Sequence, residues 1–151
     1  MSVSGSSLVD RDTTNAGGGF TLSGSGLRAG EVVTLYVDGA SEKAVTVLIA
    51  NGENMSNIFL YTKHLIIRHS TGSVVAGRHL AIADNNGDSD ITGVFTEDAG
   101  TLNVKSNNEL FIWSSTTFSS TGAVKSGSGV DINGRLVMNN NPLTLSGSFD
   151  A

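Results

Sequence analysis

Hydrophobic residues along this chain occur in short runs that are separated by glycine, serine and asparagine. The densest group lies between Asn57 and Ala83, where β-branched, aromatic and aliphatic residues alternate with a few polar ones. No run places apolar residues at i, i+3, i+4 and i+7 over a helical length, whereas short apolar runs cut by glycine and serine are typical of strands. The stretch therefore predicts roughly two or three central strands. Their predicted core residues are Ile58, Leu60, Leu65, Ile67, Val75, Leu80 and Ile82.

The residues before this stretch predict a β-hairpin between Leu27 and Ala50. Apolar residues alternate along its first half, Asp38-Gly39 is a strong turn signal, and a second apolar run returns from Ala44. After the central stretch, further short strand candidates recur about every ten to fourteen residues, without a helical pattern between them. We expect an all-β fold with no helix longer than about three turns, arranged as an antiparallel β-sandwich or jelly roll.

The last third of the chain leaves a second architecture open. Short, similar units begin at Gly122, Gly129, Gly134 and Leu143. Stacked rungs of a short β-solenoid, or of an intertwined fibre, have this kind of sequence.

The first 26 residues predict a flexible N-terminal arm, followed by a β domain over residues 27–151. Three consecutive glycines, Gly17 to Gly19, interrupt the arm. Its few apolar side chains offer too little burial to offset the entropy of ordering it within one chain. We expect the arm to bind a neighbouring subunit, by adding a strand to an open sheet edge; a disordered tail is the alternative. The predicted partner-binding residues are Val3, Leu8, Val9, Phe20 and Leu22.

Composition and charge exclude several classes of function. The chain has 151 residues, a formal net charge of −5 and nine scattered basic residues, so it lacks the basic clusters that bind a phosphate backbone. No apolar segment reaches the ~18 residues of a membrane span, and the N-terminus has no secretory signal pattern. The chain contains 19 Gly, no Cys and only 15% charged residues, which fits many tight turns and no disulfides. We expect a protein made in a cytoplasm or belonging to a larger assembly.

One acidic loop is a candidate metal site. Asp84, Asn86, Asp88 and Asp90 alternate along the chain, and calcium prefers oxygen ligands of this kind. The loop resembles the start of an EF-hand or dockerin-like loop, although Gly87 takes the fourth place instead of the sixth and Phe95 stands where the bidentate Glu belongs. The alternative is a solvated turn built on Asn86-Gly87.

Catalytic motifs are absent from the sequence. There is no Gly-x-Ser-x-Gly elbow, no Cys nucleophile and no phosphate-binding loop, so we expect a non-enzymatic protein without a cofactor, calcium apart. A carbohydrate-binding β module is one alternative, since a sugar site needs exposed aromatic residues. The candidates for such residues are Trp113, Tyr36 and Tyr61.

The sequence resembles bacteriophage virion proteins of the capsid cement (decoration) and fibre kind. The resemblance lies in the glycine- and serine-rich arm that closes with Gly-Phe-Thr-Leu-Ser-Gly-Ser-Gly, the strand-rich middle, and the final Asn-Pro-Leu-Thr-Leu-Ser-Gly-Ser-Phe. It implies a small all-β structural subunit, often trimeric, that clamps neighbouring capsid subunits in the virion; a tail or fibre component, or another extracellular assembly, is the alternative. The implied partners are further copies of the chain and a major capsid or other virion protein.

Overall fold

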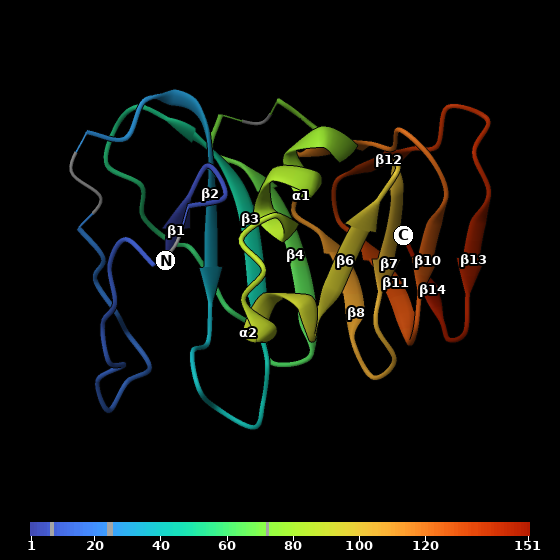
Figure 1. The fold of residues 1–151 in the computed structure, drawn as a ribbon. Coiled ribbons are helices and arrows are strands. Elements are labelled where there is room, and N and C mark those ends of the chain that lie inside the picture. Colours follow the sequence, from blue (N-terminus) through green and yellow to red (C-terminus); the bar gives the residue numbers. More distant parts are fainter. Residues whose placement is uncertain (7, 24–25, 72) are drawn as a thin grey trace.

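The computed structural model describes residues 1–6, 8–23, 26–71 and 73–151. Ser7, Gly24 and Ser25 of the predicted arm, and Gly72 of the central stretch, lie outside the described residues. The described chain is mostly strand with two short helices, which confirms a mainly β fold. In Figure 1 the colours run from blue at one end to red at the other, so the chain advances along a single axis.

The largest sheet holds seven strands, in the order β1 (Ser2–Val3), β2 (Ala29–Tyr36), β3 (Val45–Asn51), β4 (His64–His69), β8 (Glu109–Ile112), β11 (Gly129–Ile132) and β14 (Phe149–Asp150). The pairs β1–β2 and β2–β3 are antiparallel, and β2 with β3 forms the hairpin that the sequence predicts. From β3 to β14 every neighbouring pair is parallel.

Two smaller sheets complete the structure. The four-stranded sheet has the order β13 (Leu143–Leu145), β10 (Val124–Ser126), β7 (Thr101–Val104) and β6 (Phe95–Asp98). The three-stranded sheet has the order β12 (Arg135–Val137), β9 (Thr117–Ser119) and β5 (Val74–Ala76). In these sheets only the β6–β7 pair is antiparallel.

The chain visits the three sheets in turn, and this makes a short β-solenoid. β7, β8 and β9 form one rung, β10, β11 and β12 the next, and β13 with β14 begins another (Figure 1). The antiparallel sandwich or jelly roll expected from the sequence is therefore wrong for this part of the chain. The solenoid alternative describes it, because each strand pairs with the strand one rung earlier and not with its neighbour in sequence.

Stacked inward side chains form the core of the solenoid. Leu65, Leu110 and Val130 lie opposite one another on three successive parallel strands, and each is fully buried. Phe118 and Val124 do the same from the other two sheets. Full burial of such a side chain stabilises the fold by about 1.5–3 kcal/mol, and the strands need only three or four residues because each rung repeats the contact.

Glycines at the corners allow the rungs to approach closely. A Cβ atom on Gly147 would lie 1.1 Å from the carbonyl oxygen of Ser128, one rung earlier. One on Gly134 would lie 2.3 Å from the carbonyl oxygens of both Trp113 and Thr116. At these corners glycine is therefore required, because the main chains of successive rungs are in contact there.

Helix α1 (Gly77–Asp84) occupies part of the stretch that was expected to be strand. Gly77, Leu80 and Ala83 are its buried residues, and this i, i+3, i+6 spacing lies along one helical face. Leu80 is thus a core residue as predicted, but Ile82 faces away from the core and is 36% exposed. A second, one-turn helix, α2 (Ser89–Thr92), follows the acidic loop.

The first part of the predicted central stretch also differs from expectation. Ile58 and Leu60 lie in a segment without regular secondary structure and are partly buried on the outer side of the N-terminal hairpin. Leu65, Ile67 and Val75, by contrast, are strand residues with no exposed surface, as predicted.

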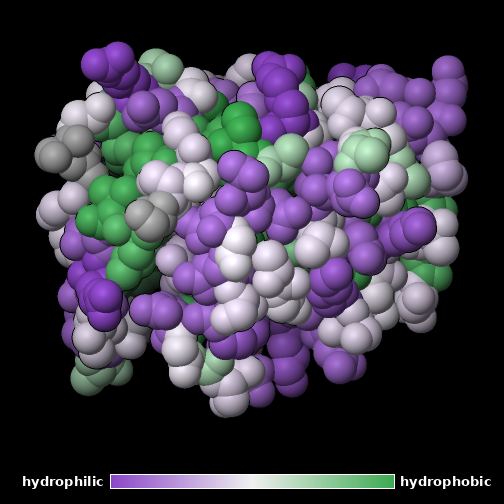
Figure 2. Space-filling view, viewed as in Figure 1, coloured by the Kyte–Doolittle hydropathy of each residue, from purple (hydrophilic) through white to green (hydrophobic). Residues whose placement is uncertain are grey.

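The N-terminal segment packs on its own domain. The main-chain pairing of β1 with β2 buries Ser2, and Met1 donates a 2.8 Å hydrogen bond from its amino group to the Asp10 carbonyl. Figure 2 shows apolar side chains gathered at this end of the molecule, while most of the same face is hydrophilic. Four of the side chains predicted to bind a neighbouring subunit contact the chain's own hydrophobic clusters, whereas Val9 is exposed; the four are Val3, Leu8, Phe20 and Leu22.

Candidate functional site

The predicted calcium loop does not bring its oxygens together. Asp84 ends α1 and accepts a 2.9 Å hydrogen bond from the Glu97 amide, whereas Asn86 donates to the Ser6 carbonyl. Asp88 caps α2 by accepting a 2.8 Å bond from the Asp90 amide. Within the part of the chain that the structure describes, no group of three or more His, Cys, Asp or Glu side chains is arranged to hold a metal ion.

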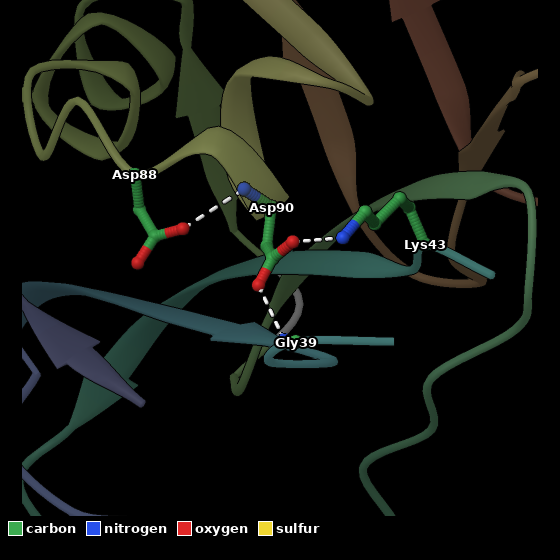
Figure 3. Close-up of polar contacts among 4 residues, drawn as sticks. All are labelled: Gly39, Lys43, Asp88 and Asp90. Atoms are coloured by element: carbon green, nitrogen blue, oxygen red, sulfur yellow. Dashed lines mark hydrogen bonds and ion pairs between the residues drawn. The ribbon is translucent and has the colours of Figure 1, made fainter. Parts of the chain in front are cut away.

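Asp90 instead fixes the loop to the N-terminal hairpin. Only 5% of the residue is exposed; its carboxylate accepts a 2.6 Å bond from the Gly39 amide and pairs with the Lys43 ammonium (Figure 3). Burial by itself raises the pKa of this carboxyl, but the hydrogen bonds from Lys43 and Gly39 outweigh it, so the pKa lies below its ordinary value. These contacts give the loop a structural role.

A cluster of four aromatic rings lies on the outer side of the largest sheet, and we call it the aromatic platform. It consists of Phe59, Tyr61, Phe111 and Trp113. The Phe59 ring lies 5.4 Å from Trp113 and 5.9 Å from Tyr61, with planes 20° and 29° apart. Phe111 meets Tyr61 edge-on at 6.0 Å and Trp113 at 5.7 Å. The rings therefore support one another in the offset and edge-to-face arrangements that aromatic pairs prefer.

The sheet positions two of these rings. Phe111 and Trp113 are two residues apart on and just after β8, so they lie on the same face of the strand. The Trp113 amide donates a 3.0 Å bond to the Ile67 carbonyl, which extends the β4–β8 ladder past the end of β8. The platform is thus anchored on regular parallel sheet.

The other two rings come from residues 52–63, the segment that crosses from β3 to β4. The Thr46 hydroxyl donates a 2.6 Å bond to the Phe59 carbonyl and holds this segment against β3. The Arg68 guanidinium lies 5.3 Å from the centre of the Trp113 ring and donates to the Asn57 carbonyl. A cation over an indole face is attractive, so Arg68 joins the segment to the platform.

Two of the four rings remain open to solvent. Phe59 is 42% exposed and Tyr61 is 39% exposed. Among the described residues, no hydrogen bond engages the Tyr61 hydroxyl or the Trp113 indole N–H. The platform therefore offers flat apolar faces with unused polar groups at their edges.

Acidic side chains lie next to the platform on the same face of the sheet. Asp131 on β11 lies directly opposite Phe111, and Asp150 on β14 lies opposite Asp131. Glu109 is on the same face as Phe111, and its Oε2 lies 3.4 Å from the His64 Nε2. Three carboxylates thus lie beside the rings.

An open groove of about 1230 Å³ adjoins the platform. Apolar side chains of the outer hairpin face line it, and Phe59 lies at the border between the groove and the platform. The groove marks where two loop segments rest on the hairpin; the apolar lining residues from these segments include Phe20, Leu22, Met55, Ile58 and Leu60.

Sequence reasoning identified half of the platform. Of the three aromatic residues proposed for a sugar site, Tyr61 and Trp113 belong to it. Tyr36 does not: it is buried near Asp88, and burial together with that carboxylate raises its pKa to about 12. Phe59 and Phe111 were missed, although each stands two residues before a proposed aromatic, the spacing that puts strand residues on one face.

No protein-family model, curated protein or solved structure matches this chain. Among the described residues, no helix is long and apolar enough to cross a membrane.

Proposed function

We propose that this chain is a carbohydrate-binding β module that holds a glycan on the aromatic platform and carries out no chemistry on it. Sugar rings have faces of C–H groups, which the negative face of an aromatic ring attracts, and edges of hydroxyl groups that need hydrogen-bonding partners. The platform has both kinds of partner. The observation that carries the proposal is the exposure of Phe59 and Tyr61. The two rings stack with one another, and Phe59 also stacks with Trp113, which the sheet positions.

Native gel electrophoresis tests this proposal, with one soluble polysaccharide included in each gel. A polysaccharide that binds retards the protein, and we expect Tyr61→Ala to weaken binding roughly tenfold, which corresponds to about 1.4 kcal/mol of lost stacking. Val74→Ala is the matched control, because Val74 is similarly exposed but lies on the three-stranded sheet. The proposal fails if no polysaccharide retards the protein, or if the Tyr61 and Val74 variants bind equally.

We also propose a second function, as a structural subunit of a larger assembly such as the phage virion that the sequence resembles. One observation favours it: Phe149 on β14 is 54% exposed, and the outer edges of β13 and β14 pair with no further strand among the described residues. Open strand edges with an apolar side chain are typical contact surfaces. The stacked rungs fit the fibre alternative, and further copies of the chain are the partners expected first.

Size-exclusion chromatography with light scattering tests the assembly proposal. We expect the intact chain to form an oligomer and Phe149→Ser to dissociate it, with polysaccharide retardation unchanged. If the intact chain stays monomeric even at concentrations that saturate typical specific contacts, the assembly proposal is contradicted. The carbohydrate proposal is unaffected by that result.

A further inference from the structure

A carboxylate beside the platform, that of Asp131, has no partner. Asp131 is half-buried on the outer side of β11, and among the described residues no hydrogen bond or ion pair engages its side chain. It lies opposite Phe111 on the neighbouring strand, and neighbouring strands are about 4.8 Å apart. Phe111 in turn lies 6.0 Å from Tyr61, so a ligand that extends from Tyr61 across Phe111 would reach this carboxylate.

Acidic and basic side chains around Asp131 differ in the partners that they have. Two further carboxylates lie on the same sheet face: Asp150, and Glu109, whose Oε2 lies 3.4 Å from the His64 Nε2. The nearby basic groups are occupied: Arg68 lies over Trp113 and donates to the Asn57 carbonyl, and Lys63 lies 3.7 Å from a Glu42 carboxylate oxygen. Three carboxylates therefore lie beside the rings, and neither Arg68 nor Lys63 pairs with Asp131.

We infer that the platform binds a glycan with free amino groups, whose ammonium pairs with Asp131 while its ring stacks on Tyr61 and Phe59. This inference rests on the proposed carbohydrate binding. An acidic sugar would meet like charges, whereas a neutral sugar gains only hydrogen bonds at this carboxylate. A charge-assisted hydrogen bond to an ammonium is roughly twice as strong as a neutral one, and partial burial of Asp131 reduces its screening by solvent.

The test compares glucosamine oligomers with fully N-acetylated oligomers of the same length, by isothermal titration calorimetry at mildly acidic pH and low salt. We expect the intact chain to bind the glucosamine oligomer about tenfold more tightly, and added salt to reduce this preference. Asp131→Asn keeps the shape of the side chain and should make the two affinities equal. Asp98→Asn, which changes an exposed acid on β6, is the matched control and should keep the preference.

The outcomes separate this inference from the proposed function. The inference is overturned if Asp131→Asn keeps the preference, or if the intact chain prefers the acetylated oligomer or an acidic polysaccharide. In those cases glycan binding that Tyr61→Ala weakens still supports a carbohydrate site. If neither oligomer nor any other polysaccharide binds, the inference and the proposed function both fail.

Discussion

Asp90 illustrates how one buried charge can direct a loop away from the role that its sequence suggests. Its carboxylate belongs to an alternating acidic pattern, but the structure buries it and supplies a cation and a main-chain amide. A buried charge is tolerated only with such partners. Composition and spacing show that acids alternate, but the Lys43 contact comes from a hairpin far away in the chain, and no local pattern predicts it.

Replacing Lys43 with Met should destabilise the protein strongly at neutral pH. The Asp90 carboxylate then remains buried without its cation, which costs about 3–5 kcal/mol, toward the lower end because Lys43 itself is partly exposed. Because the pKa of Asp90 in the folded state lies below its ordinary value of 3.8, the pair stabilises the fold above that pH, and the stabilisation is lost as pH falls through the lowered pKa.

Urea unfolding at pH 7 and near pH 3 measures this effect. The cost of Lys43→Met should shrink in acid, where the variant's carboxyl is protonated. Lys125→Met removes an exposed lysine from β10 and should change the free energy of unfolding little at either pH. Equal stability of the Lys43 and Lys125 variants at pH 7 would show that the Asp90 contact does not hold the loop.

The elements that the sequence predicts correctly are those whose signals are local in the chain. The hairpin of β2 and β3 is predicted correctly because alternation and the Asp38-Gly39 signal are both local. The solenoid strands are only two to four residues long from β7 onward, too short to show whether they pair with a neighbour in sequence or with the preceding rung. Helix α1 is missed because its buried face includes Gly77, which carries no hydrophobic signal.

Leu110→Ala should lower the free energy of unfolding by about 2–5 kcal/mol, because Leu110 is fully buried between Leu65 and Val130 in adjacent strands. Ile82→Ala, at a residue that the sequence places in the core, should cost less than about 0.5 kcal/mol, since the side chain is on the exposed face of α1. Chemical denaturation of both variants measures the difference. Comparable losses of stability in the two variants would contradict the orientation of α1, in which Ile82 faces away from the core.

Gly134→Ala should disturb the corner that supports Trp113. The added Cβ would meet two carbonyl oxygens of the preceding rung, and relieving such overlaps typically costs about 1–3 kcal/mol. Gly17→Ala is the control, because its Cβ would have only an ordinary 3.4 Å contact with the Asn15 side chain. Thermal unfolding compares the two, and a Gly134 variant as stable as the Gly17 variant contradicts the close stacking of rungs.

The two ends of the solenoid differ in character, and one of its faces carries the candidate site. Antiparallel strands and the N-terminal segment cover the first end, whereas at the other end β13 and β14 each have one edge that pairs with no strand in the described part of the chain. The outer face of the largest sheet carries the platform, with the acidic row beside it. Its rings come from residues 52–63 and from β8 with the residue that follows it, and only parallel pairing of β4 with β8 brings these segments together. The sequence therefore suggests aromatic residues for a sugar site but does not predict which of them lie together.

The central claim, that the aromatic platform binds a glycan, is tested most directly through Trp113. It is the single tryptophan of the chain, so intrinsic tryptophan fluorescence reports on the platform alone. On titration with glucosamine oligomers, we predict a saturable change in the fluorescence of the intact chain and of Val74→Ala, and a midpoint at roughly tenfold higher oligomer concentration for Tyr61→Ala. A chain whose fluorescence stays constant with every glycan, or changes equally in the Tyr61 variant, would contradict the claim.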